Sequence, residues 1–277
     1  MENDRTDDRA AVHADAEIAF ASAIAAHRLA ATAPERTAPA HEYYQTSLLS
    51  ALMQGVYDGE VTIAALLEHG DFGLGTFNGL DGEMVVIDGT AYRLSGDGTA
   101  ELADGGAMTP YAAVIWFRPD VVERLGTRCA RAALERHLDG LAASPNLFYA
   151  VRVDGRFSRV RIRNVTRQTP PYRPLAEAIA DQTVSDLRDV AGSLVGFRCP
   201  NYAAGIGVPG YHLHFIADDR QTGGHVLDYE LVSGRILLDH TANIHLALPD
   251  GAAFAAGDPA SHPDDAANDD VQRRGSG

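Results

Sequence analysis

Three histidines lie within one short stretch of the sequence, "PGYHLHFIADDRQTGGHVLDYE", at residues 209–230. Successive side chains of a β-strand point to opposite faces, so His212 and His214 project together while Leu213 points away from them. The segment "ADDRQTGG" supplies turn residues, and "HVLDYEL" returns as a second strand that begins at His225. The stretch therefore predicts a β-hairpin with an imidazole pair on one strand and a third imidazole on the other.

The register of this hairpin decides whether the three imidazoles meet. If Ala217 pairs with Gly224, then His225 lies opposite Ile216, which shares a face with the histidine pair. A slip of one residue would turn His225 to the opposite face of the sheet. We expect the register that lets all three imidazoles converge.

Three neutral imidazoles on a rigid sheet are a typical ligand set for a divalent transition metal, with a further coordination position open to a substrate. The alternative is that His212, His214 and His225 are ordinary polar strand residues, such as those at an interface. An HxH pair with a third histidine across a tight hairpin favours the metal site. The sequence therefore predicts a metal site formed by these three residues.

Two further residue types could take part in chemistry. Glu83 follows two glycines at the head of an apolar strand, where a carboxylate could act as an acid, a base or a ligand. A solvent-facing strand glutamate is the commoner alternative. Arg159, Arg161 and Arg163 share one face in "RVRIRNV". They form either a solvated row paired with acids or a row in which one member binds a substrate carboxylate through its bidentate fork.

The segments that must position these residues read mainly as β-strands. Residues 83–102 contain two Asp-Gly pairs between apolar runs, which is a strong hairpin signal. Residues 146–165 contain a third such pair, and residues 111–119 read as a strand that a proline ends. We expect helices over residues 62–70 and 120–141, the latter with a break near Gly126.

Helix and linker signals in the second half of the sequence suggest where the chain divides into domains. Residues 174–187 read as a helix that opens with proline, and the preceding segment "RQTPPYRPL" reads as a linker. We expect an N-terminal β-rich domain at 41–168 and a C-terminal domain with the metal-binding hairpin at 169–256. The regions 1–40 and 257–277 are acidic and poor in large apolar side chains, as in flexible tails.

Composition excludes several classes of protein. The formal net charge is -15, which argues against a nucleic-acid or anionic-membrane partner. All 23 basic residues are arginine, so an enzyme that forms a lysine Schiff base and a Walker P-loop are both excluded. The two cysteines suggest no disulfide framework. The acidic N-terminus lacks a signal-peptide pattern and no apolar stretch spans a membrane, so we expect a cytoplasmic protein.

Several long blocks of the sequence resemble the α-acetolactate decarboxylase family. They are "LEHGDFGLGTFNGLDGEMVVIDGTAY", "RNVTRQTPPYRPL", "LVGFRCPNYAAGIGVPGYHLHFIADDR" and "GGHVLDYE", in the family's order. The resemblance runs from about Tyr43 to about Phe254. It implies an α/β, β-rich fold with two domains built on mixed and antiparallel sheets and a metal site in the cleft between them. It also implies a homodimer.

The resemblance also implies a set of site residues. The family binds Zn²⁺ through three histidines and has an active-site glutamate, an active-site arginine and a pocket-lining threonine that contacts the substrate. The matching positions here are His212, His214, His225, Glu83, Arg163 and Thr76. One position departs from the family, which has a second active-site glutamate near the C-terminus. This sequence has no glutamate there; the position falls near Val271, beside Asp269 and Asp270, and we expect Asp270 to take that role.

The activity that the resemblance implies is the conversion of 2-acetolactate to acetoin and carbon dioxide. Loss of carbon dioxide leaves an electron pair that delocalises into the neighbouring ketone as an enediolate. Without a lysine imine, a divalent cation would serve as the Lewis acid that stabilises this charge. Arg163 would orient the departing carboxylate, and Glu83 is the best candidate to protonate the enediolate.

Two other functions fit parts of the pattern. A cupin-type oxygenase or isomerase also uses an HxH pair with a later histidine, although Asp218 and Asp219 stand here where such enzymes carry a glutamate. A weakened or non-catalytic family member, which only binds a keto acid or dimerises, would explain the missing C-terminal glutamate. An assay for acetoin separates these hypotheses.

Overall fold

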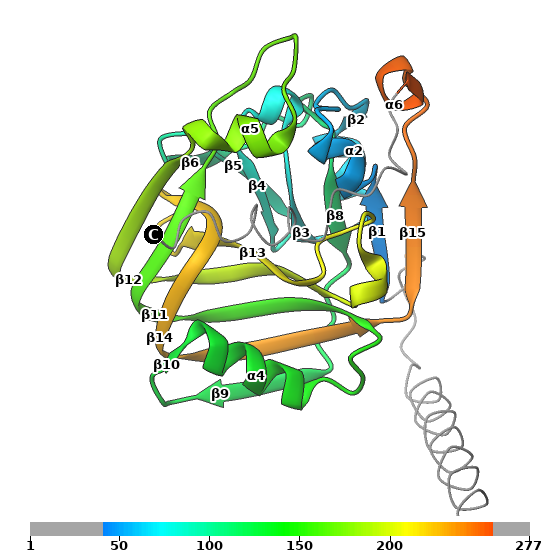
Figure 1. Ribbon diagram of the computed structural model, residues 1–277. Helices are drawn as coiled ribbons and strands as arrows, with labels where there is room; N and C mark the ends of the chain where they lie inside the picture. Colours follow the sequence, from blue (N-terminus) through cyan, green and yellow to red (C-terminus); the bar gives the residue numbers. More distant parts are fainter. Residues whose placement is uncertain (1–40, 257–277) are drawn as a thin grey trace, which may run out of the picture. The chain divides into compact units, whose positions relative to one another are not determined.

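The computed structural model describes residues 41–256 (Figure 1). The expected tails at 1–40 and 257–277, and with them Asp270, lie outside the described residues. In the described range the fold is β-rich, as the sequence predicts, with two large sheets and a small two-stranded sheet. No helix among residues 41–256 is long and apolar enough to cross a membrane.

The first large sheet is mixed. The edge strand at residues 243–247 pairs in parallel with its neighbour at residues 42–46, and all the other neighbouring strands are antiparallel. The strand order is β15 (Asn243–Ala247), β1 (Glu42–Thr46), β8 (Ala112–Ile115), β3 (Phe72–Thr76), β4 (Glu83–Ile87), β5 (Thr90–Leu94) and β6 (Ala100–Leu102).

The second large sheet is antiparallel and contains much longer strands. Its order is β10 (Cys129–Ala130), β14 (Gly223–Thr241), β11 (Phe148–Asn164), β12 (Thr183–Cys199) and β13 (Gly210–Ala217), and β9 (Val121–Leu125) pairs with β14. Because β14 also pairs with β13, the hydrogen-bonded order β14–β11–β12–β13 returns to β14. This closure brings the beginning of β14 beside β13, where the histidine hairpin lies.

Short elements connect and cover the sheets. The helices are α2 (Leu49–Met53), α3 (Ile63–Leu67), α4 (Arg131–Leu141), α5 (Leu175–Ala178), α6 (Ala252–Ala256) and the 3₁₀ turns η1 (Asn78–Leu80), η2 (Ile179–Asp181) and η3 (Asn201–Ala203). The small sheet pairs β2 (Val61–Thr62) with β7 (Met108–Thr109). Figure 1 shows α4 beside the second sheet, and its Leu134 and Leu138 are buried in that sheet's core.

A shared apolar core holds the two large sheets together. Phe72, Leu74 and Val85 from the first sheet pack in one cluster with Val195 and Phe197 from the second. Burying side chains of this size stabilises the fold by about 1.5–3 kcal/mol each. The facing layers therefore form a rigid support on which polar groups from both sheets can be positioned.

The Asp-Gly pairs have two different structural roles. At the turn between β4 and β5, Asp88 and Gly89 have φ values of 52° and 77°, as the predicted two-residue hairpin requires. The turn before β6 contains Gly98, also at positive φ. The third predicted hairpin is wrong, because Asp154 and Gly155 lie inside the continuous strand β11.

The reason for this difference is close packing between strands. Gly155 lies directly opposite Gly192 of β12 and Gly234 of β14. A Cβ atom at Gly155 would meet the carbonyl oxygen of Ser233 at 2.6 Å. Glycine is therefore used here for a close approach of backbones, which a local hairpin signal cannot reveal.

Two of the predicted helices are partly wrong. Residues 121–125 form β9, and only residues 131–141 of the segment are helical. Val121 and Val122 favour a strand, and β9 completes a pairing with β14 that the sequence pattern does not show. The helix predicted at 174–187 ends early, because residues from Thr183 onward belong to β12. The short helix near residue 63 is confirmed.

The sheets do not divide at the boundary expected near residue 168. Strand β11 precedes this position, yet it pairs along its length with β12 and β14, which follow it. The segment around residue 168 is indeed irregular, but it connects two neighbouring strands of one sheet. The layers are therefore built from interleaved parts of the sequence, and β15 from the C-terminal part joins the first sheet. The two cysteines are free, as expected.

Candidate metal and active site

The second sheet positions three of the predicted site residues in one cross-strand row. Arg163 of β11 pairs with His225 of β14, and His225 pairs with His214 of β13. His212 lies two residues before His214 on β13 and therefore projects from the same face. Strand pairing alone thus brings residues 163, 214 and 225 together from three parts of the chain.

The hairpin register differs from the predicted one by two residues. His225 lies opposite His214 rather than Ile216, and Gly224 lies opposite Phe215 rather than Ala217. The prediction of the register is wrong because the turn is tighter than expected: the backbone N–H of Ala217 donates to the carbonyl oxygen of Thr222 at 2.9 Å, which leaves only residues 218–221 in the loop. A shift of two residues keeps the same face, so the imidazoles still converge.

The three imidazole rings form a nearly equilateral triangle. Their centroids are separated by 5.2 Å between His212 and His214, 5.1 Å between His212 and His225, and 5.3 Å between His214 and His225. One nitrogen from each ring lies within 4.8 Å of the other two. His214 and His225 are buried, and His212 is partly exposed. This spacing suits three ligands around one small cation.

A backbone contact fixes the tautomer of His214. Its Nδ1 lies 2.8 Å from the carbonyl oxygen of Met84, which can only accept a hydrogen bond, so Nδ1 carries the proton. The lone pair is therefore on Nε2, and this buried atom has no hydrogen-bond partner within the described part of the chain. Such an imidazole, held by a backbone acceptor and with an unsatisfied Nε2, fits a metal ligand.

The electrostatic surroundings keep two of these imidazoles neutral. Burial lowers the pKa of His212 well below its usual value, and the neighbouring His214 and Arg163 lower it further. Burial also lowers the pKa of His214 to about 4, although the bond to Met84 opposes the shift. Neutral imidazoles are the form that binds a cation, so the donor set fits a divalent metal at neutral pH.

The first sheet supplies the opposing side of the site. Thr76 of β3 and Glu83 of β4 are directly paired, and the Thr76 hydroxyl donates a hydrogen bond to the carbonyl oxygen of Gly82 at 2.8 Å. The Glu83 carboxylate lies 3.6 Å from Nε2 of His214. Burial raises the pKa of Glu83 to about 7, although the positive charge of Arg163 opposes this shift. A carboxyl with this pKa can give or take a proton near neutrality.

Arg163 is the one member of the predicted arginine row that points into the site. Arg159 makes ion pairs with Asp228 and Asp186 and lies on the solvated surface. Arg163 is only 4% exposed, and its Nη1 donates a hydrogen bond to Oε1 of Gln182 at 3.4 Å. Burial lowers its pKa, but a guanidinium stays charged. Arg163 therefore points inward, and its binding of a substrate carboxylate stays a prediction.

A pocket joins the polar groups to an apolar wall. Its polar lining includes Thr76, Glu83, Arg163, His212 and His225. The apolar lining consists of Leu49, Leu52, Leu80, Tyr111, Val165, Leu175, Ile179 and Val208. The sequence did not indicate this wall, because its members come from short helices and loops that are far apart in the chain. The pocket can hold a small polar molecule that also carries alkyl groups.

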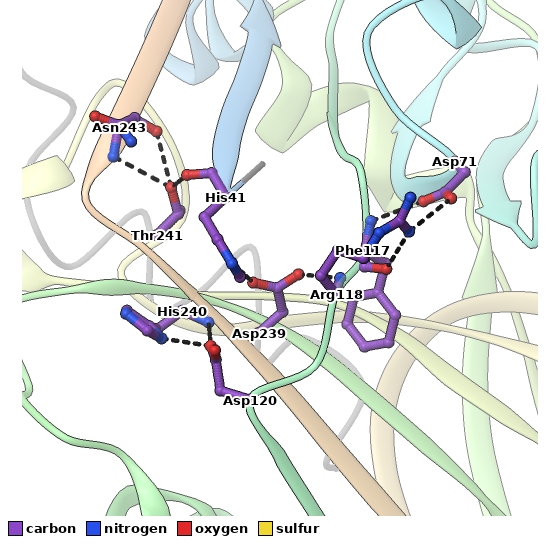
Figure 2. A network of polar contacts seen from close by, with 9 residues as sticks. All are labelled: His41, Asp71, Phe117, Arg118, Asp120, Asp239, His240, Thr241 and Asn243. Atoms are coloured by element: carbon purple, nitrogen blue, oxygen red, sulfur yellow. Dashed lines mark hydrogen bonds and ion pairs between the residues drawn. The ribbon is translucent and has the colours of Figure 1, made fainter. Parts of the chain in front are cut away.

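A second histidine cluster lies at a different place and has a different character (Figure 2). Nδ1 of His41 lies 2.7 Å from Oδ1 of the fully buried Asp239, whose Oδ2 accepts a hydrogen bond from the backbone N–H of Arg118. Nδ1 of His240 contacts Asp120. The donors are close enough to be considered as cation ligands, but here each imidazole is already bonded to a carboxylate.

These ion pairs change the charge state of the second cluster. The hydrogen bond that His41 makes to Asp239 raises the pKa of His41, while burial raises the pKa of Asp239. Burial opposes ionisation of Asp120, but the bonds from His240 outweigh it and lower that pKa. The contact between His41 and Asp239 therefore favours an imidazolium–carboxylate pair. The cluster connects the residue before β1, the segment between β8 and β9, and the end of β14.

Comparison with known proteins identifies close relatives of the whole described region. Residues 43–258 match the family model described as alpha-acetolactate decarboxylase. An alpha-acetolactate decarboxylase of Raoultella terrigena is 47% identical over 221 residues, which cover 80% of this chain and 85% of the relative. The alpha-acetolactate decarboxylase of Bacillus subtilis strain 168 is 41% identical over 220 residues, 79% of this chain and 86% of the relative.

Solved structures agree with the sequence comparison. The crystal structure of the Bacillus subtilis strain 168 alpha-acetolactate decarboxylase superposes with a TM-score of 0.81 at 40% identity, and the match covers 84% of this chain and 99% of the other. A Staphylococcus aureus protein of unknown function, described as similar to alpha-acetolactate decarboxylase, superposes with a TM-score of 0.77 at 30% identity. That match covers 83% of this chain and 97% of the other.

Proposed function

This chain belongs to the alpha-acetolactate decarboxylase family, and we propose that it is a Zn²⁺-dependent decarboxylase that converts 2-acetolactate to acetoin and carbon dioxide. The observation that supports this most directly is the convergence of His212, His214 and His225 beside a pocket whose lining includes Glu83 and Arg163. The relatives carry the name of a decarboxylase that acts on acetolactate, which makes the protein a lyase. Zinc and the roles of individual residues are our proposal.

The three histidines are the groups that would hold the metal. They offer neutral nitrogen ligands from a rigid sheet, which suits Zn²⁺. When bound, a divalent cation supplies Lewis-acid stabilisation for the negative charge that decarboxylation leaves on the substrate. The carbonyl of Met84 holds His214 in the tautomer and orientation that this role needs.

Arg163 is the group that we assign to the substrate carboxylate. Its guanidinium stays charged and can bind a carboxylate through two parallel hydrogen bonds. Because it lies directly opposite His225 in the sheet, its position relative to the histidines is fixed by strand pairing. It would hold the carboxylate beside the reacting carbon until carbon dioxide leaves.

Glu83 is the group that we assign to proton transfer. The electron pair left by decarboxylation moves into the ketone as an enediolate, which needs one proton on carbon to give acetoin. With a pKa raised to about 7 by burial, Glu83 is partly protonated at neutral pH and can donate that proton. Its fixed position on β4 would deliver the proton to one face of the enediolate.

Thr76 completes the substrate contacts in this proposal. Its hydroxyl hydrogen is used in the bond to Gly82, so the Thr76 oxygen can accept a hydrogen bond but has no second proton to donate. The tertiary hydroxyl of 2-acetolactate can donate such a bond. The apolar wall of Leu49, Leu52 and their neighbours would receive the two methyl groups of the substrate.

The proposal is tested by incubating the purified chain, loaded with Zn²⁺, with racemic 2-acetolactate. We expect acetoin and carbon dioxide in equal amounts, at a rate far above the spontaneous reaction. If a well-folded, metal-loaded protein converts acetolactate no faster than the spontaneous reaction, this result contradicts the proposal and favours a weakened family member. The role of Asp270, the homodimer and the cytoplasmic location stay predictions.

A further inference from the structure

The guanidinium of Arg163 has a neutral partner at the edge of the pocket. Its Nη1 donates a hydrogen bond to the amide oxygen Oε1 of Gln182 at 3.4 Å. We propose that Gln182 is a positioning residue, which fixes the orientation of Arg163 for the carboxylate of the substrate. The inference rests on the proposed function, since it assigns to Gln182 an effect that acts through Arg163.

Sheet pairing explains why these two residues meet. Asn164 at the end of β11 pairs with Thr183 at the beginning of β12, and Arg163 pairs with Val184. Gln182 immediately precedes Thr183, so it lies beside the end of β11. The contact between Gln182 and Arg163 is therefore a consequence of the register of the long β11–β12 pair.

The segment before Gln182 is anchored by burial. Leu175 and Ile179 are 8% and 2% exposed, and they pack in the apolar cluster that includes Leu80 and Tyr111. The backbone N–H of Gln182 donates to the carbonyl oxygen of Ile179 at 3.2 Å. Since Leu175 and Ile179 also line the pocket, one short segment supplies both part of the apolar wall and the partner of Arg163.

The amide has a chemical advantage over a carboxylate at this position. A guanidinium has five N–H donors, and an amide oxygen occupies one of them without neutralising the positive charge. Glu83 already places one carboxylate close enough to influence Arg163 electrostatically. A second carboxylate at position 182 would neutralise the charge that has to attract the substrate. A glutamine therefore orients Arg163 and leaves its charge available.

The experiment compares the steady-state kinetics of Gln182→Leu, Gln182→Glu and the wild-type enzyme with 2-acetolactate. Loss of one hydrogen bond to a charged group should raise KM about tenfold in Gln182→Leu. The turnover number should change by less than about twofold, because the carboxylate is bound in the ground state and leaves during the reaction. Gln182→Glu keeps the acceptor but adds charge, so its KM should rise about tenfold more than that of Gln182→Leu.

A double-variant cycle separates positioning from a direct or merely structural role. In the Arg163→Ala background, Gln182→Leu should have no further effect on KM, because the group through which it acts is gone. Asp181→Asn is the matched control, since Asp181 neighbours Gln182 but pairs with Arg173 outside the pocket lining. Zinc content and the unfolding transition of each variant show that the fold and the metal site are intact.

The outcomes are distinguishable. Unchanged KM in both Gln182 variants, or an equal effect of Gln182→Leu with and without Arg163, overturns the inference while the decarboxylase function stands. A wild-type enzyme that fails to release carbon dioxide from acetolactate overturns the proposed function and this inference together. A raised KM that disappears in the Arg163→Ala background supports the positioning role.

Discussion

Two clusters of histidines in this protein have opposite electrostatic surroundings. In the cluster of His212, His214 and His225, burial lowers the pKa of His212 and of His214, and the backbone carbonyl of Met84 holds His214. In the other cluster, His41 and His240 each contact an aspartate. The first arrangement offers lone pairs to a cation, and the second offers protons to carboxylates.

The comparison shows that histidine count and proximity do not define a metal site. Both clusters have ring or carboxylate atoms close enough to surround one ion. The clusters differ in whether an imidazole proton already balances the charge of a neighbouring carboxylate. A proton on His41 can neutralise Asp239, whereas the neutral imidazoles of His212 and His214 have no carboxylate to balance and can offer their lone pairs to a divalent cation.

The largest expected effect separates the clusters by activity. His214→Ala removes a ligand and should lower kcat/KM by about a thousandfold or more, since a bound metal supplies several kcal/mol of charge stabilisation. It should also lower the zinc content of purified protein. His240→Ala is the matched control from the other cluster and should keep both zinc and activity. Equal losses in the two variants would erase the distinction between the clusters.

The next effect sharpens the assignment within the active site. Glu83→Gln should retain zinc but lower turnover by about a hundredfold or more, because general acid catalysis contributes this much. Glu101→Gln, on an exposed position of β6, is the control and should behave as the wild type. Wild-type turnover in Glu83→Gln would remove Glu83 from the mechanism.

The pH profile tests Glu83 independently. If its protonated form is the donor, the rate should fall as the pH rises through the pKa of Glu83, which burial raises to about 7. A cation bound beside it favours the carboxylate and would move this fall to lower pH. The fall should be absent from the residual activity of Glu83→Gln. A rate that rises through the same range would identify Glu83 as a base.

A smaller effect concerns the stability of the second cluster. Asp239→Asn removes the negative partner of His41 and should lower the free energy of unfolding by about 2 kcal/mol, since hydrogen bonds between charged groups contribute about this much. Urea unfolding measures the change. Zinc content and kcat/KM should stay within about twofold of wild type. Loss of zinc in Asp239→Asn would show that the two clusters are coupled.

The smallest expected effect is on how the free energy of unfolding of the metal-free protein depends on pH. The two clusters should change it in opposite directions. For His214, the pKa falls from 6.5 unfolded to about 4 folded, so its contribution is complete above 6.5 and lost as the pH falls towards 4. For His41, the folded pKa is raised above 6.5, so its contribution is complete below 6.5 and lost as the pH rises through the folded value.

These opposite slopes can be measured by urea unfolding between about pH 4 and pH 8, the range over which histidines titrate in proteins. His214→Ala should remove part of the acid loss, and His41→Ala should remove part of the loss at higher pH. The same slope for both clusters would contradict the assigned charge states.

Much of the site could be predicted from local patterns. The HxH spacing places His212 and His214 on the same face of the strand. A register shift of two residues leaves His225 on that face as well. The Asp-Gly turn before Thr90 was visible for the same reason, because two-residue turns have a strong local signal. These features depend on residues that are close in the sequence.

The features that the sequence did not reveal depend on distant partners. The continuity of β11 through Gly155 follows from glycines in two other strands. Strand β9 exists because it pairs with β14, and Gln182 meets Arg163 because of the register of β11 and β12. The cluster of His41 and Asp239 joins residues 198 positions apart. No local pattern encodes such pairings.

The most direct test of the central claim is a titration of metal-free protein with Zn²⁺, with bound metal and carbon dioxide release from 2-acetolactate recorded together. We expect decarboxylation to rise in proportion to zinc bound and to reach its maximum at one ion per chain. The triple variant His212→Ala, His214→Ala, His225→Ala should bind no ion at this site and stay inactive. Full activity before zinc is added, or in that triple variant, would contradict the account.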